Sequence, residues 1–136
     1  MHKSLMIAAA LALPLSAAAG AQEAASMAPP AAPYQQVSKL VKLPDFIPGL
    51  GSLFVDPSTL PAGPFVAYDR TGKLATTIYM IPLEDLQAQK TFDGLGVGAS
   101  TVTAVDMHYN AGHPGVENPH YHVVLWHGDK AGFDLK

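Results

Sequence analysis

The histidines are the residues of this chain whose type and spacing most clearly suggest chemistry. Apart from His2, every histidine falls within one short stretch of the sequence: His108, His113, His120, His122 and His127. Neutral imidazoles bind divalent transition metals, and such sites require several of them close together. This stretch therefore predicts a metal site.

The spacing of His120 and His122 predicts that they project together. Both lie in residues 119–127, which are rich in β-branched and aromatic residues typical of a strand. Alternate side chains of a strand share a face, so these two imidazoles are expected to point the same way. Antiparallel pairing with residues 101–109 would place Asp106 and His108 opposite them.

The predicted ligands and their supporting groups follow from this geometry. We expect the metal ligands to be His108, His113, His120 and His122, with Asp106 and Glu117 as a carboxylate ligand or as partners that orient an imidazole. Nitrogen ligands of this kind suit Zn, Cu, Ni or Fe better than Ca or Mg. His127 belongs to the opposite face of its strand and is left out of the site.

Two other interpretations of the histidines stay open. They could be polar residues on a half-exposed hairpin, some of them capping loop backbone. They could also respond to pH, because protonation of all five would move the mature formal charge from −4 to about +1 near the range where histidine titrates.

The rest of the sequence carries no recognisable catalytic arrangement. It has no nucleophile elbow, no phosphate-binding Gly-Lys-Ser/Thr loop and no dinucleotide fingerprint. We therefore assign no catalytic residue and favour a non-catalytic metal- or ligand-binding protein. The alternatives are a structural or stress-response homo-oligomer with pH-responsive histidines, and a metal-dependent enzyme with an open coordination position.

The elements that must position the histidines are mainly strands. Residues 65–68 and 73–81 favour strands and flank Asp69-Arg70-Thr71-Gly72, a turn sequence with glycine where positive φ is needed, which predicts a β-hairpin. Residues 101–109 and 119–127 predict a second hairpin. Between the two hairpins, residues 82–90 predict one short helix, with proline at its start and lysine at its end.

The predicted organisation is a single exported domain over residues 37–136. We expect an α+β fold dominated by antiparallel sheet, with two hairpins and one short helix. Residues 22–36, rich in Ala, Pro and Gln, predict a flexible leader. Residues 43–51 are apolar but interrupted by prolines and glycines, so they should pack irregularly against the sheet.

The first 21 residues are typical of a secretory signal peptide. Lys3 precedes an uncharged apolar run over residues 5–15, and Ala19-Gly20-Ala21 fits the small-residue rule for cleavage. The run is shorter than the roughly 20 residues needed to cross a bilayer, so we expect no membrane span in the mature protein. Export predicts a periplasmic or secreted location.

Cysteine content and charge narrow the possible functions. The chain has no cysteine, which excludes thiolate zinc sites, iron–sulfur clusters, cysteine nucleophiles and lipoprotein acylation. Loss of Lys3 with the signal changes the formal charge from −3 to −4. An acidic balance of this kind disfavours nucleic acid as a partner.

Two sequence blocks carry a family resemblance. They are residues 54–65 (FVDPSTLPAGPF) and 112–122 (GHPGVENPHYH), accompanied by 68–74 (YDRTGKL) and 78–86 (IYMIPLEDL). Together they resemble an uncharacterised family of exported bacterial domains whose prototype is controlled by a sigma-E/anti-sigma-E stress system. The resemblance implies an exported, β-rich, homo-oligomeric domain without an assigned reaction.

One departure from that family pattern concerns the histidines. The resemblance implies Pro-His-aromatic-Asp-x-His on the last strand. Here Pro119, His120 and Tyr121 match, whereas His122 stands at the Asp position and Val124 at the second His position. The resemblance therefore implies a variant ligand set.

Overall fold

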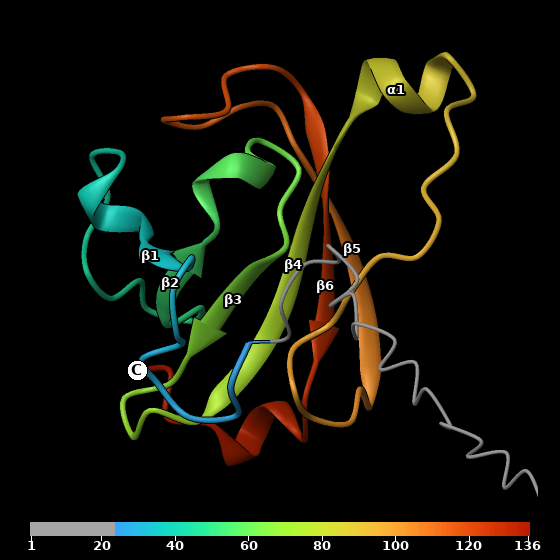
Figure 1. Cartoon of the computed structure of the whole chain (residues 1–136). Coiled ribbons are helices and arrows are strands. Elements are labelled where there is room, and N and C mark those ends of the chain that lie inside the picture. Colours follow the sequence, from blue (N-terminus) through green and yellow to red (C-terminus); the bar gives the residue numbers. More distant parts are fainter. Residues whose placement is uncertain (1–23) are drawn as a thin grey trace, which may run out of the picture.

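The computed structural model describes residues 24–136, and its strands form one antiparallel sheet of six strands. The strands are β1 (Gln35–Gln36), β2 (Ser52–Val55), β3 (Phe65–Tyr68), β4 (Leu74–Pro82), β5 (Ala104–Asn110) and β6 (His120–Trp126). Their order across the sheet is β1-β2-β3-β4-β6-β5 (Figure 1). The prediction of a mainly antiparallel fold with one short helix is confirmed.

Strand β6, which carries two of the candidate ligands, lies inside the sheet. It pairs with β4 on one side and with β5 on the other, so β5 forms the edge. Both β4 and β6 are rich in β-branched and aromatic residues, which suit a pleated and largely buried surface. The site is thus built on a strand held by backbone hydrogen bonds along both sides.

The turn between β3 and β4 is stabilised by Asp69. One oxygen of its buried carboxylate accepts hydrogen bonds from the backbone N–H groups of Thr71 and Lys73, at 2.9 and 3.0 Å. Gly72 has φ +82°, a left-handed conformation that glycine adopts without steric cost. The turn signal in the sequence therefore corresponds to the local structure.

The helix α1 (Leu83–Gln87) is shorter than the predicted residues 82–90. Pro82 is its N-cap, still paired in β4 opposite His120, rather than its first helical residue. At the other end Gln89 has φ +58°, so the chain leaves the helical conformation there. Three short 3-10 helices complete the elements: Val37–Lys39, Pro57–Thr59 and Lys130–Gly132.

Two apolar clusters pack on the sheet. The larger one contains Val55, Ile78, Met80, Val124 and Trp126, and side chains from the irregular residues 41–50 pack against it. The predicted irregular packing of residues 43–51 corresponds to this contact. The smaller cluster contains Val66, Tyr68 and Leu74 and is covered by residues near the start of the described chain.

Residues 24–36 differ from the flexible leader that we expected. Ala24 is only 2% exposed and belongs to the smaller cluster, and its carbonyl accepts a hydrogen bond from Ala99. Ser26 and Ala28 hydrogen-bond to backbone groups of Leu74 and Gly72, and β1 pairs with β2. Small and proline-rich residues here do not prevent order, because their backbone groups find partners on the sheet.

The predicted signal peptide, residues 1–21, lies outside the described residues. Within residues 24–136, no helix is both long and apolar enough to cross a membrane.

Candidate metal centre

Strand β6 brings His120 and His122 to one face of the sheet. In the register with β4, these residues lie opposite Pro82 and Met80. Their face continues with Val124 and Trp126 of the larger apolar cluster, and the shared face of the two histidines is the one that strand alternation predicted. His120 is 1% exposed, and its Nε2 lies 2.9 Å from Nε2 of His122.

The loop between β5 and β6 supplies the third imidazole, His113. Its backbone forms a tight turn in which His113 and Val116 exchange N–H···O bonds of 2.9 and 3.0 Å. The loop reaches over the same side of the sheet as residues 37–50 (Figure 1). Nε2 of His113 consequently lies 3.2 Å from Nε2 of His120 and 3.3 Å from Nε2 of His122.

Backbone carbonyls orient two of the three rings. Nδ1 of His120 donates to the Asn118 carbonyl at 2.7 Å, and Nδ1 of His113 donates to the Pro114 carbonyl at 3.1 Å. A carbonyl oxygen can only accept, so Nδ1 carries the proton in both rings. In the neutral rings, each Nε2 therefore offers a lone pair, and metal-bound histidines are typically oriented in this way.

Burial and the neighbouring histidines favour the uncharged form of His122. The pKa of His122 is lowered from 6.5 to about 4, mainly by burial and further by the neighbouring His120, His113 and His108. Neutral imidazole is the form that coordinates a metal. His122 can thus bind a cation at neutral pH without first losing a proton.

The nitrogen separations match those around a transition metal. A metal–nitrogen bond of about 2.0–2.1 Å places two ligand nitrogens about 2.9 Å apart at 90° and about 3.3 Å apart at the tetrahedral angle. The three measured separations, 2.9, 3.2 and 3.3 Å, span that interval. Within the described residues, His113, His120 and His122 lie close enough together to bind one metal ion.

The remaining predicted site residues lie elsewhere. His108 is opposite His122 in the β5–β6 register, but it is exposed and outside the group of three. The carboxylate of Asp106 accepts a hydrogen bond from the Trp126 indole at 2.9 Å, so it orients the core rather than an imidazole. Glu117 is exposed at the tip of the loop and hydrogen-bonds to none of the three rings.

His127, which directly follows β6, has a structural role on the opposite face of the sheet. Its Nδ1 donates to the Ser100 carbonyl at 3.0 Å, and its Nε2 accepts from the Thr77 hydroxyl at 2.7 Å. The Thr77 oxygen in turn accepts from the Gly98 N–H at 2.9 Å. This buried chain of hydrogen bonds holds the glycine-rich loop against the sheet and involves none of the candidate ligands.

The sequence did not reveal a cavity beside the three histidines. It has a volume of about 330 Å³ and lies between the sheet and residues 37–50. Its walls are mainly aliphatic, and His108, His113 and His122 are among the lining residues. The only sequence signal for it was the apolar, proline-interrupted segment 43–51, which covers the sheet without filling the space beneath.

The fold and the site thus define a small antiparallel β-sheet domain with a three-histidine centre beside an apolar cavity. Among solved structures, the chain is similar to the crystal structure of hypothetical protein TTHB210 from Thermus thermophilus, with 45% sequence identity and a TM-score of 0.57. The alignment covers 64% of this chain and 85% of that protein. The chain belongs to the same family as TTHB210.

The other comparisons identify no relative. No family model matches the chain, and no curated protein matches it. The functional conclusion therefore rests on the site.

Proposed function

We propose that this chain is an exported metal-binding protein in which His113, His120 and His122 hold one divalent transition metal. The observation that carries the proposal is the convergence of three Nε2 atoms while two Nδ1 atoms donate to carbonyls. In the neutral rings of His113 and His120 the proton is on Nδ1, so their two Nε2 lone pairs face each other with no proton between them. A metal cation accepts all three lone pairs at once.

The proposed metal is Zn, Cu, Ni or Fe. Three imidazole nitrogens, with neither thiolate nor carboxylate in the group, form a donor set that Ca and Mg do not favour. Three protein ligands also leave at least one coordination position for water or another small molecule, which distinguishes such sites from closed structural ones. Because His113 and His122 line the cavity, a metal bound between them would lie next to an apolar space.

Metal content is the direct test. Protein covering residues 22–136, purified without an affinity tag, should contain close to one equivalent of metal after exposure to each candidate ion. His120→Ala and His122→Ala should each reduce that content strongly. His108→Ala is the matched control, because this histidine lies on the same side of the sheet but outside the group, and it should retain the metal.

A metal-dependent enzyme is the second candidate, and the open position beside a cavity favours it. A metal held by three neutral imidazoles can lower the pKa of its bound water to about 7 and so supply hydroxide as a nucleophile. The zinc-loaded protein should then hydrolyse an activated ester such as p-nitrophenyl acetate. If the zinc-loaded protein hydrolyses the ester no faster than His122→Ala does, the enzyme hypothesis is rejected and only the metal-binding function remains.

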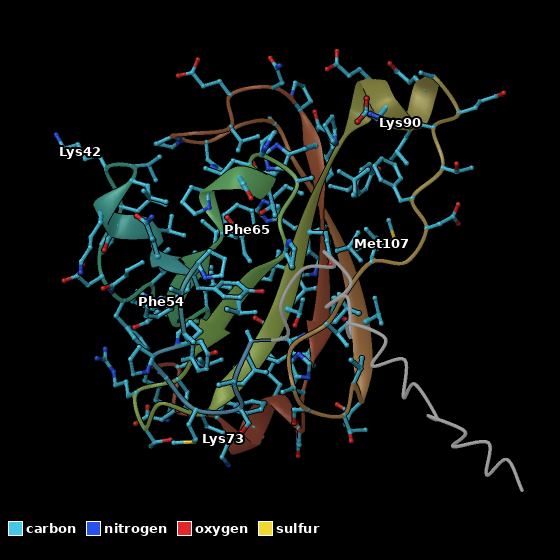
Figure 2. All side chains as sticks on the ribbon, in the orientation of Figure 1. Lys42, Phe54, Phe65, Lys73, Lys90 and Met107 are labelled. Carbon is cyan, nitrogen blue, oxygen red and sulfur yellow. The ribbon has the colours of Figure 1, made fainter. Side chains whose placement is uncertain are left out.

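We also propose that the chain forms a homo-oligomer. On β5, Val105, Met107 and Tyr109 are 56%, 59% and 56% exposed. They lie opposite half-buried Leu125, Val123 and Tyr121 of β6, and these six side chains, here called the apolar stripe, share the sheet face away from the cavity. Figure 2 shows Met107 extending from β5 on that side. A second copy covering the apolar stripe would remove these side chains from water. The stripe contains no histidine, so this interface would not carry the pH-responsive histidines considered from the sequence.

A further inference from the structure

The cavity beside the three histidines has the size and the opening of a small-molecule site. Its volume of about 330 Å³ falls at the lower end of the range of about 300–1,000 Å³ seen for ligand pockets. Leu40 and Leu60, which are 37% and 44% exposed, line it and mark where it meets solvent. A molecule could therefore enter without unfolding of the sheet.

Apart from the histidines, the side chains that line the cavity are apolar. Leu43 and Leu50 contribute from the covering segment, and Leu53, Ile78 and Val124 contribute from the sheet. Water bound among such side chains would find few hydrogen-bond partners. The body of a ligand that fills this space must accordingly be apolar.

The three histidines give the cavity one polar end. His113 and His122 line the cavity and also belong to the group whose Nε2 atoms converge, so a metal held by that group would lie beside this space. Three neutral imidazoles leave the full charge of a divalent metal uncompensated, and no carboxylate belongs to the group. An anionic oxygen donor would both complete the coordination and balance part of the charge.

We infer that the cavity binds an aliphatic carboxylate, with its chain among the leucine and isoleucine side chains and its carboxylate on the metal held by His113, His120 and His122. This inference rests on the proposed metal-binding function and specifies its ligand. The chain supplies affinity through burial of apolar surface, and the metal fixes which end enters first.

The wall of the cavity is also in contact with the loop that carries His113. A Cβ built on Gly115 would lie 3.1 Å from Cγ1 of Val41, so the loop packs closely on the covering segment. Val41 and Gly115 both line the cavity. The metal ligand and the apolar wall therefore form one continuous site rather than two neighbouring ones.

Cobalt and octanoate provide the test. Co²⁺ bound to the chain gives visible absorption bands that change when its coordination changes, so one titration reports both steps. We expect Co²⁺ bands that are absent in His122→Ala, and a change of those bands when octanoate is added. Acetate, which has the same head group without the chain, should bind at least about tenfold more weakly than octanoate.

Cavity-filling substitutions separate the apolar contribution from the metal. Leu53→Trp and Leu40→Trp should weaken octanoate binding at least about tenfold while the Co²⁺ bands remain. Leu95→Trp is the matched control, because Leu95 is exposed on a loop and does not line the cavity. It should leave octanoate binding unchanged.

These experiments distinguish failure of the metal site from failure of the carboxylate inference. Absence of Co²⁺ bands refutes the metal site and this inference with it. Bands that form but do not respond to octanoate, or that respond equally to acetate, overturn the inference and leave the metal site intact. Octanoate binding that survives both tryptophan substitutions at full strength also overturns it.

Discussion

The Nε2 atoms of His120 and His122 lie 2.9 Å apart, with ring centroids 4.8 Å apart. Alternate residues of a strand are separated by about 6.6 Å along the chain, so the two rings lean toward each other. Neutral imidazoles can share at most one proton between two such nitrogens. Nε2 of His113 lies within 3.3 Å of both of these nitrogens. A single proton can join only two of the three nitrogens, whereas one metal ion can bind all three.

Zinc is expected to stabilise the folded chain. A ligand that binds only the folded state adds about 2.7 kcal/mol at a free concentration of one hundred times its Kd. For a domain of this size, that corresponds to a rise of roughly 10–20 °C in the unfolding midpoint. Calorimetry of residues 22–136 with and without zinc measures the rise, and a chelator should reverse it.

Single histidine substitutions should show which rings hold the zinc. His113→Ala and His122→Ala should abolish most of the rise, because each removes one of three ligands. His108→Ala should retain it, since His108 is outside the group. An equal rise in all three variants would mean that zinc binds elsewhere on the chain.

Gly112 should control the position of His113. Its φ is +132°, and a Cβ added there would lie 2.2 Å from the Glu117 carbonyl oxygen, so Gly112→Ala must move the loop. His120 and His122 stay on β6, and we expect zinc affinity to fall about 10- to 100-fold, as for other groups that orient metal ligands. A competition titration against a chromophoric chelator measures the affinity.

Gly94→Ala is the control for that experiment. Gly94 also has a positive φ, +64°, but a Cβ there would meet nothing within 4 Å. Alanine there would also have to adopt a positive φ, although a less strained one than at Gly112, and it would meet no collision. Zinc affinity in Gly112→Ala equal to that in Gly94→Ala would contradict a positioning role for Gly112.

Most of the sheet could be predicted because its signals are local. The composition of residues 65–68 and 73–81 favours strands, and Asp69 and Gly72 mark the turn between them. The helix was overestimated, since Pro82 and Gln89 limit it to five residues through tertiary pairing and a left-handed φ that composition does not specify. Order in residues 24–36 depends on hydrogen bonds to distant strands, which no local pattern encodes.

The site could be predicted only in part, for a similar reason. His120 and His122 follow from strand alternation, and the pairing of His108 opposite His122 follows from the register. The approach of His113 to His120 and His122 depends on the backbone conformation of Gly112 and on the packing of Gly115 against Val41. Both are set by tertiary structure rather than by a local sequence pattern. The cavity is the space left between the sheet and residues 37–50. Its volume depends on how these side chains pack in three dimensions, which the sequence pattern does not specify.

Acid should destabilise the fold through His127. Burial lowers the pKa of His127 below its ordinary 6.5, despite backbone carbonyls that favour the charged form. Between the folded and unfolded pKa values of His127, the unfolded chain binds more protons than the folded chain. The stability that depends on neutral His127 is therefore fully present above about pH 6.5 and is lost as the pH falls. The slope cannot exceed about 1.4 kcal/mol per pH unit for one group.

The matched variant for this effect is His127→Gln, which retains hydrogen-bonding groups but does not titrate. Denaturant unfolding between pH 7 and pH 5, in the presence of a chelator, measures the free energy of both proteins. Whatever the stability of the variant at pH 7, its loss on acidification should be smaller than that of the unchanged chain. Equal losses would show that His127 does not contribute.

Disruption of the apolar stripe should prevent self-association. Met107 is 59% exposed at the centre of the stripe, and a charge there would have to be desolvated in any interface that covers it. We expect the unchanged chain to sediment as an oligomer and Met107→Glu as a monomer with an unaltered circular dichroism spectrum. Leu86→Glu, on exposed α1 outside the stripe, should remain oligomeric. A monomeric unchanged chain at high concentration would refute the oligomer, and an oligomeric Met107→Glu would place the interface on another face.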